Sequence, residues 1–236
     1  MIGVVRNLTT DFLTQSAQAL ERAIRSAQMV VIPGGFSGGD EPEGSGKFIA
    51  SFLRSPALAD AIMDLLRHRD GLMLGSCNGF QSLVKLGLVP YGEIRDMDET
   101  CPTLTYNLIG RHQSSYVTTR VASVSSPWVL KSQVGDLHTI PISRGEGRFV
   151  APKAALESLI ANGQVATQYV DAAGQPTMDI AFNPNGSIAA IEGIFSPDGR
   201  VFGKMGHSER RGPYVGVNIP GDKPQPPLDS GAASLR

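Results

Sequence analysis

The chain has 236 residues, of which 41% are hydrophobic and 18% charged, and its formal net charge is −1. This composition is typical of a folded domain, and the near-zero charge favours neither a nucleic acid nor an anionic membrane as a partner. No apolar run reaches the roughly 18 residues of a membrane-spanning helix. The first residues lack the layout of a secretory signal, so we expect a cytoplasmic protein.

The first third of the chain alternates short apolar runs with segments of helical spacing. We predict strands over 2–5, 29–32 and 72–74, and helices over 10–27, 47–54, 57–69 and 80–86. The run at 29–32 is continuously apolar, as in a parallel strand covered on both faces. The alternation predicts an α/β fold with a doubly wound, mostly parallel sheet, in which sites form at the carboxyl ends of strands.

The rest of the chain is richer in strands. Segments 104–108, 116–124 and 137–142 follow one another without helices, which predicts an antiparallel portion beside the main sheet. A helix is predicted over 151–161, followed by strands over 165–170, 188–194 and 200–205. Ser-Pro-Asp-Gly at 196–199 indicates a hairpin between the last two strands. We take 1–220 as a single domain and expect a disordered tail over 221–236, which is rich in Pro, Gly and Ser.

Gly75-Ser-Cys-Asn-Gly79 stands between a predicted strand and a predicted helix, with Cys77 at the apex. Small flanking residues permit the strained backbone of such a turn, and a helix N-terminus favours thiolate over thiol. The N–H of Asn78 can also point at an oxyanion. These features make Cys77 a candidate nucleophile, although the local pattern fits a buried structural cysteine equally well.

A thiol nucleophile needs a base, and the base needs a group that orients it. The chain has four histidines. His207 is the candidate because it follows a predicted strand and has Glu209 two positions on, in a turn that we expect to open a short helix. His68 fits a solvated helix end, and His112 and His138 fit satisfied polar positions. A His-x-Glu pair by itself is more often a polar surface turn.

Cys77, His207 and Glu209 each follow a predicted strand, as do the paired glycine amides at 34–35. They are therefore expected to share one edge of the sheet. A Cys–His–Glu site beside backbone N–H donors suits acyl transfer from an amide through a thioester. The two cysteines, Cys77 and Cys101, form neither a disulfide framework nor a Cys-x-x-Cys pair, so no metal site is predicted.

Several stretches of the chain match the pattern of a known family. They are Pro33-Gly-Gly-Phe-Ser-Gly-Gly-Asp40, Gly75–Gln81, Lys85-Leu-Gly-Leu-Val-Pro90, Pro141-Ile-Ser-Arg-Gly-Glu-Gly-Arg-Phe149 and Gly203-Lys-Met-Gly-His-Ser-Glu-Arg210. With these motifs the chain closely resembles the glutaminase domain of phosphoribosylformylglycinamidine synthase. That domain is a class I glutamine amidotransferase with a flavodoxin-like sheet.

The resemblance implies a role for each site residue. Cys77 is implied as nucleophile, His207 as base and acid, and Glu209 as the orienting carboxylate. It further implies that Gly35, Phe36 and Asn78 donate to the oxyanion. Gly34 and Gln81 are implied to line the glutamine pocket.

The resemblance also implies a partner. Ammonia freed from glutamine would pass to a synthetase domain, fused or separate, that amidates formylglycinamide ribonucleotide in purine biosynthesis. ATP and Mg²⁺ are expected in that synthetase, and no cofactor is expected in this domain.

The chain departs from the family at three places. Arg144 stands where the family often has His, and Gly206 and Ser208 stand where prolines are common. The chain also begins near the family's second strand, so we expect the first strand and helix to be missing or supplied in trans, which would leave a strand edge exposed.

Two alternatives to a glutaminase stay open. One is a catalytically inert remnant or interaction domain. The other is a different cysteine hydrolase on the same fold, which would turn over peptides or esters without preferring glutamine.

Overall fold

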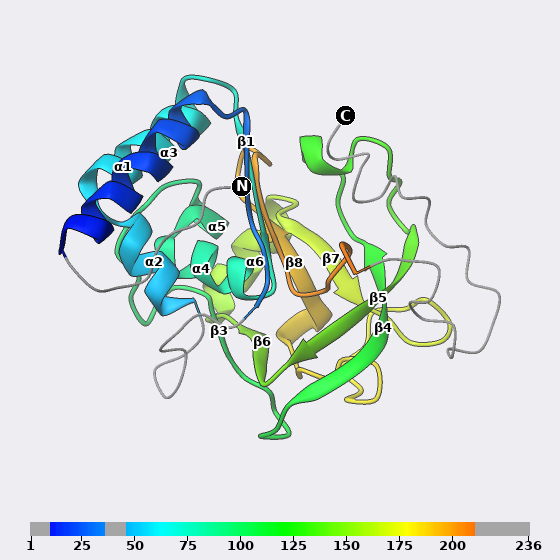
Figure 1. Ribbon diagram of the computed structural model, residues 1–236. Helices are drawn as coiled ribbons and strands as arrows, with labels where there is room; N and C mark the ends of the chain where they lie inside the picture. The colour runs from blue at the N-terminus through cyan, green and yellow to red at the C-terminus, as the bar shows by residue number, and fades with distance from the viewer. Residues whose placement is uncertain (1–9, 36–45, 211–236) are drawn as a thin grey trace.

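The structure, a computed structural model, describes residues 10–35 and 46–210. Its helices are α1 (Thr10–Ser26), α2 (Lys47–Leu53), α3 (Pro56–Arg67), α4 (Asn78–Leu86), α5 (Leu88–Tyr91) and α6 (Lys153–Ala161), with 3₁₀ turns at Pro127–Val129 and Ile188–Ala190. Its strands are β1 (Met29–Ile32), β2 (Leu72–Ser76), β3 (Thr103–Tyr106), β4 (Gln113–Val121), β5 (Leu137–Arg144), β6 (Glu146–Val150), β7 (Val165–Tyr169), β8 (Ile191–Phe195) and β9 (Val201–Lys204). Figure 1 shows their arrangement.

The described strands form a main sheet of order β1-β2-β9-β8-β7-β4-β5 and a separate pair, β3 with β6. β1, β2 and β9 run parallel, and every other neighbouring pair is antiparallel. The predicted α/β class is confirmed, but the sheet is mixed rather than mostly parallel. No α-helix lies in the fully described connections β4–β5, β7–β8 and β8–β9, and strands joined without a crossover helix pair antiparallel. Of the portion predicted to lie beside the main sheet, β4 and β5 instead extend that sheet, whereas β3 pairs with β6 outside it.

The parallel part of the sheet determines where a site can form. Because β1, β2 and β9 share one direction, their carboxyl ends lie at the same edge. β1 leads into Gly34, β2 into Cys77, and β9 into His207. Three segments far apart in the sequence therefore meet at this edge.

Helix α4 packs against this part of the sheet, and nearly all of its residues are buried. Glycines permit the close approach. A Cβ on Gly79 would collide with the carbonyl oxygen of Ile32 in β1, and one on Gly203 in β9 would collide with the ring of Phe80. The helix ends at Gly87, which has φ 89° and so takes the left-handed conformation typical of a helix C-terminus.

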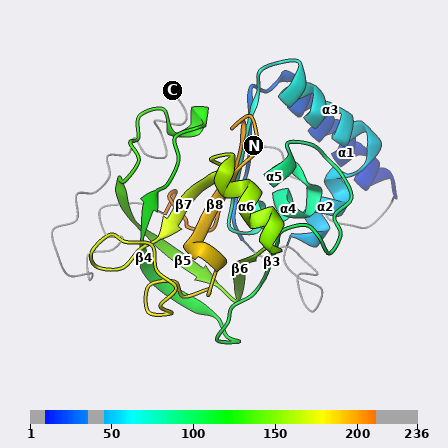
Figure 2. The same cartoon turned by 180° about the vertical axis from the view of Figure 1, so that it is seen from behind.

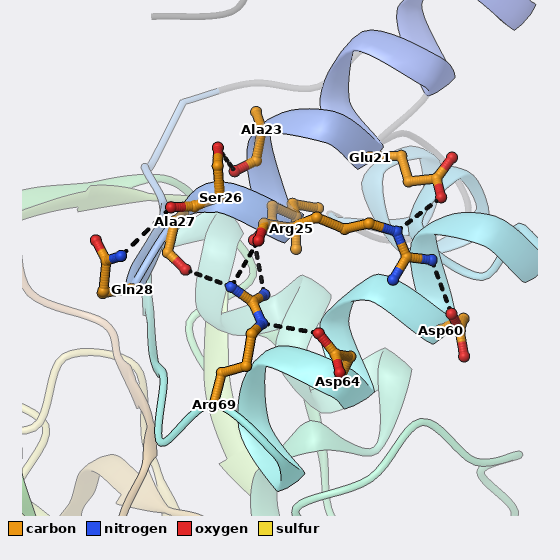
Figure 3. A network of polar contacts seen from close by, with 10 residues as sticks. Glu21, Ala23, Arg25, Ser26, Ala27, Gln28, Asp60, Asp64 and Arg69 are labelled. Atoms are coloured by element: carbon orange, nitrogen blue, oxygen red, sulfur yellow. Dashed lines mark hydrogen bonds and ion pairs between the residues drawn. The ribbon is translucent and has the colours of Figure 1, made fainter.

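Helix α3 buries Leu58, Ala61, Ile62 and Leu65, a spacing that places them on one helical face. Helix α1 lies along α3, and Figure 3 shows the polar contacts that join their ends. Arg69 donates from Nη2 to the carbonyl of Ile24 at 2.8 Å and from Nη1 to that of Ala27 at 2.8 Å. It thereby adds hydrogen bonds from a cation to carbonyls at the C-terminal end of α1, where a positive charge is favourable.

Strand β1 is less covered than its sequence predicts. Met29 and Val31 are 37% and 47% exposed, whereas Ile32 is buried. The expectation that this strand is covered on both faces is therefore wrong. On the far side of the molecule, Figure 2 shows α6 in front of β7 and β8, and Leu159 of α6 joins the same core cluster as Ile194 of β8.

Most other predicted elements are found with small changes at their ends, and the predicted hairpin joins β8 to β9. Strand β6 was not predicted. The residues after β9 form a turn through Glu209, not the expected short helix. Predictions for 2–5, Phe36 and the tail over 221–236 lie outside the described residues, so the domain boundary at 220 stays a prediction. In the part of the chain that the structure describes, no helix is long and apolar enough to cross a bilayer.

Candidate active site

Cys77 occupies a sharp turn between β2 and α4. Its backbone has φ 59° and ψ −111°, a conformation that residues other than glycine rarely adopt. The turn is fixed on both sides, because the N–H of Cys77 donates to the carbonyl of Lys204 at 2.8 Å and its carbonyl accepts from the N–H of Gln81 at 3.2 Å. The side chain is buried. The predicted sharp turn between a strand and a helix, with Cys77 at its apex, is thus present.

His207 follows β9 and is 1% exposed. Its Nδ1 lies 2.5 Å from Oε1 of Glu209, whose side chain is half exposed. The ring is also held through the backbone, since the N–H of His207 donates to the carbonyl of Pro141 at 2.9 Å. This is the geometry of a base oriented by a carboxylate, with Nε2 facing away from that carboxylate.

Gly34 separates the thiol from the imidazole. A Cβ built on Gly34 would lie 2.5 Å from Cε1 of His207 and 3.2 Å from Sγ of Cys77. Both side chains therefore border the space that exists because residue 34 has no side chain. Cys77, His207 and the glycine turn after β1 converge here, as their positions after strands predict.

Charges around Cys77 favour its thiolate. Burial raises the pKa of the Cys77 thiol, but a polar contact with His207, the positive charge of Arg144 and the N–H of Gly35 outweigh it and lower the pKa to about 7. Burial lowers the pKa of His207, but its contacts with Cys77 and Glu209 outweigh burial and raise the pKa to about 9. Between these two pH values the pair carries a thiolate and an imidazolium.

The polar contact with His207 is the largest of the causes that lower the pKa of Cys77. Among the described residues, Nε2 of His207 has no partner in hydrogen-bonding geometry. The two side chains are thus close enough to shift each other's pKa, although the contact does not have the geometry of a formed hydrogen bond. Such catalytic contacts commonly tighten only when substrate is bound.

Arg144 is the main addition to the predicted site. It is buried at the end of β5, donates from Nη2 to Oε1 of Gln81 at 2.8 Å, and contacts the carbonyl of Glu146. Gln81 in turn donates from Nε2 to Oε2 of Glu146 at 2.9 Å. The amide of Gln81 therefore bridges a buried arginine and a buried glutamate, one helical turn from Cys77.

The predicted oxyanion donors are placed only in part. The N–H of Gly35 is close enough to Cys77 to lower the pKa of its thiol. Asn78 is buried at the start of α4, directly after Cys77. Its Nδ2 donates to the carbonyl of Gly35 at 2.9 Å and so ties the glycine turn to α4. Phe36 lies outside the described residues.

The other candidate side chains lie away from this point. His68 and His112 are exposed, and Nε2 of His112 contacts the hydroxyl of Ser143 at 3.2 Å. His138 is partly buried in β5. Cys101 is buried, and its thiol donates to Oδ1 of Asp98 at 3.4 Å. Of the histidines, only His207 borders the same space as Cys77.

Arg144 is a departure from the family pattern whose role, in contacting a synthetase or in shaping the pocket, the sequence leaves open. A charged residue at a strand end usually faces solvent, and its burial here depends on partners distant in the sequence, Gln81 and Met205. A weak signal was available for Glu192, which interrupts the otherwise apolar strand 191–195. A carboxylate in such a run is buried and needs polar partners.

Comparison with known proteins bears on this geometry. Residues 4–229 match the CobB/CobQ-like glutamine amidotransferase domain family. The phosphoribosylformylglycinamidine synthase subunit PurQ of Synechococcus elongatus is 35% identical over 225 residues, covering 92% of this chain and 87% of that one. PurQ of Aquifex aeolicus is 36% identical over 190 residues, covering 80% and 75%. Among solved structures, PurLQS from Thermotoga maritima matches with a TM-score of 0.61 and 27% identity, covering 89% of this chain and 80% of that one.

Proposed function

Because the chain belongs to the CobB/CobQ-like glutamine amidotransferase domain family, we propose that it is the glutaminase component of a phosphoribosylformylglycinamidine synthase. In this function it hydrolyses glutamine to glutamate and ammonia through a thioester on Cys77. The observation that carries the chemistry is the meeting of Cys77 and His207 at Gly34, with Glu209 at 2.5 Å behind the imidazole.

The reaction begins with attack of the Cys77 thiolate on the side-chain amide carbon of glutamine. A pKa of about 7 for this thiol supports a thiolate at neutral pH. The negative oxygen that forms would accept hydrogen bonds from the backbone N–H groups of Gly35 and Asn78. His207, with a pKa of about 9, then gives its proton to the leaving nitrogen, and ammonia departs from a glutamyl thioester.

The second half of the reaction reverses these proton movements. His207 is now neutral and removes a proton from a water molecule, which attacks the thioester carbon. Collapse of the second tetrahedral intermediate breaks the C–S bond, so that glutamate leaves and the thiolate of Cys77 is restored. Throughout, Glu209 keeps the proton of the imidazole on Nδ1 and stabilises its charged form.

The ammonia would be passed to a synthetase subunit or domain that amidates formylglycinamide ribonucleotide. The relatives PurQ carry the name of a subunit of that synthase, and the solved PurLQS assembly supports a separate synthetase partner. ATP and Mg²⁺ would act in the synthetase, with no cofactor in this chain. A cytoplasmic location belongs to the same proposal and is supported by the two unpaired thiols, Cys77 and Cys101.

Covalent labelling tests the proposal. The full chain would be incubated with the chloroketone analogue of glutamine and its intact mass measured, with and without excess glutamine. We expect one adduct, located on Cys77 by peptide mapping, that glutamine suppresses. Cys77→Ala should abolish the adduct, whereas Cys101→Ala, which removes the other buried thiol, should leave it unchanged.

Turnover provides the second measurement. Glutamate release by the chain assembled with its synthetase should disappear in Cys77→Ala. Glutamine hydrolysis that survives this substitution would overturn the thioester mechanism. Equal turnover of simple esters and glutamine would favour a general cysteine hydrolase instead, and a folded chain that neither labels nor hydrolyses glutamine with the synthetase present would favour an inert interaction domain.

A further inference from the structure

Glu192 is a buried carboxylate that the proposed chemistry does not use. It lies in β8, between β9 and β7, and its side chain is 0% exposed. A carboxylate removed from water is costly unless donors surround it. Its two oxygens have two different partners, of which one is the residue directly before His207.

The first partner is the turn that carries His207. Oε1 of Glu192 accepts a hydrogen bond from the N–H of Gly206 at 2.5 Å, and the backbone carbonyl of Glu192 accepts from the N–H of Met205 at 3.1 Å. The second partner is Thr167 in β7, whose hydroxyl donates to Oε2. Glu192 therefore connects β7 to the two residues immediately before His207.

Gly206 is confined on its other sides as well. A Cβ at this position would collide with the side chain of Ile140 and would lie 3.0 Å from Oε1 of Glu192. The carbonyl of Gly206 accepts from the hydroxyl of Ser76, next to Cys77, at 3.3 Å. The peptide groups flanking Gly206 are thus held by Glu192 on one side and by the nucleophile's own strand on the other.

These contacts restrict the backbone of Gly206, which directly precedes His207 in the sequence. Glycine has more backbone freedom than any other residue, so a glycine directly before a catalytic base would leave the imidazole poorly placed unless other groups fixed it. Three hydrogen bonds fix the segment, from the N–H groups of Met205, Gly206 and His207. Among these, only the one from Gly206 ends on a side chain.

We propose that Glu192 is a positioning residue that holds the Gly206–His207 peptide so that the imidazole faces Cys77. The proposal rests on the proposed role of His207 as the base. It assigns no contact with substrate to Glu192. Without the acceptor, the Gly206 N–H would be buried and unpaired, and the turn would move to satisfy it.

The test compares three variants of the full chain. Glu192→Met keeps the volume of the side chain but removes both acceptor oxygens. Glu192→Gln keeps one acceptor for the Gly206 N–H and turns its amide toward Thr167. Thr167→Val leaves the carboxylate without its second anchor. The readout is the rate of Cys77 alkylation by iodoacetamide against pH, because a thiolate stabilised by imidazolium reacts at lower pH than an isolated thiol.

In the wild type, alkylation should rise through pH about 7. Glu192→Met should react about tenfold more slowly at pH 7 and should approach the wild-type rate at high pH, since a shift of one pH unit changes the thiolate fraction about tenfold. Glu192→Gln should stay within about twofold, and Thr167→Val should fall between them. With the synthetase present, kcat for glutamine should fall in Glu192→Met while KM changes little.

Leu65→Ala is the matched control, because it removes a fully buried side chain of α3 and lowers stability without touching the site. Its alkylation profile should match the wild type. An unchanged profile in a folded Glu192→Met would overturn the proposal. If that variant does not fold, an unchanged profile in Thr167→Val would overturn it.

Alkylation by iodoacetamide needs no glutamine, so the two proposals fail separately. A chain that hydrolyses no glutamine but shows the Glu192-dependent profile would refute the glutaminase function alone. A chain that hydrolyses glutamine with a profile indifferent to Glu192 would refute the positioning role alone.

Discussion

Nη2 of Arg144 donates to Oε1 of Gln81 at 2.8 Å, and this contact fixes a buried cation one helical turn from the nucleophile. The arginine is therefore the second positive group, after His207, that stabilises the Cys77 thiolate. The sequence analysis notes it as a departure from the expected family pattern, and the structure places it beside Gln81 within the candidate site.

Replacing Arg144 by Met should raise the pKa of the Cys77 thiol above about 7, because one of the two nearby positive charges is lost. Alkylation of Cys77 at pH 7 should slow by roughly three- to tenfold. Arg144→Lys should recover part of the effect, and Arg67→Met, which changes an exposed arginine on α3, should have none. An alkylation profile of Arg144→Met that coincides with the wild type would contradict this electrostatic role.

The pH dependence of glutamine hydrolysis should have a plateau between about 7 and about 9. Below this range Cys77 is protonated, because its pKa is lowered only to about 7, and attack slows. Above it His207, whose pKa is raised to about 9, loses the proton that the leaving nitrogen needs. The measurement is kcat/KM against pH for the chain with its synthetase. A rate that keeps rising through pH 10 would mean that His207 is not the acid.

Glu209→Gln should move the upper limb of that profile to lower pH. The carboxylate contributes to the raised pKa of His207, so its removal lowers that pKa from about 9. The neutral amide also fixes the imidazole tautomer less well, and kcat should fall by about tenfold or more. Because half of the Glu209 side chain is exposed, the change should hardly affect unfolding by denaturant. An unshifted upper limb would mean that Glu209 does not set the pKa of His207.

Gly34→Ala should inactivate the site while leaving the fold intact. The added methyl group would lie 2.5 Å from Cε1 of His207 and 2.9 Å from Cβ of Cys77, so it would force the base and nucleophile apart. We expect kcat/KM to fall by about a hundredfold or more, since misplacement by about 1 Å has that effect. Gly145→Ala is the control, because a Cβ there meets nothing within 4 Å. Near-normal activity in Gly34→Ala would show that the turn has room to move.

Cys77→Gly should be more stable than Cys77→Ala. Both remove the thiol, but only glycine adopts φ 59° and ψ −111° without strain. The difference in the free energy of unfolding should be about 1–3 kcal/mol, the range for a residue held in a sparsely populated backbone conformation. Denaturant titration of the two variants measures it. Equal stabilities would mean that the turn relaxes when the thiol is absent.

Much of the fold follows from local patterns in the sequence. The apolar run at 29–32 gave the bounds of β1, and Gly87 marked the end of α4 because it takes a left-handed conformation. Strand β6 was missed for a physical reason. Gly145 and Gly147 flank its start and read as turn residues, whereas β6 is held by pairing with β3, about forty positions earlier in the chain.

The residues of the candidate site also fall into those that the sequence could predict and those that it could not. Cys77, His207 and Glu209 were predictable because each follows a strand in a recognisable turn. Arg144 and Glu192 were not, since what makes them important is burial beside groups distant in the sequence. Charged residues are usually exposed, and only the packed structure reveals which ones are not.

The position of β9 has a consequence for how the site comes into being during synthesis. This strand lies between β2 and β8, both of which precede it in the chain, and it delivers His207 to a nucleophile made 130 residues earlier. A ribosome-bound chain that ends before β9 therefore carries Cys77 without its base or the sheet neighbour that accepts its N–H. The site is complete only after the hairpin between β8 and β9 closes, so the pairing of Cys77 with His207 is among the last features to form.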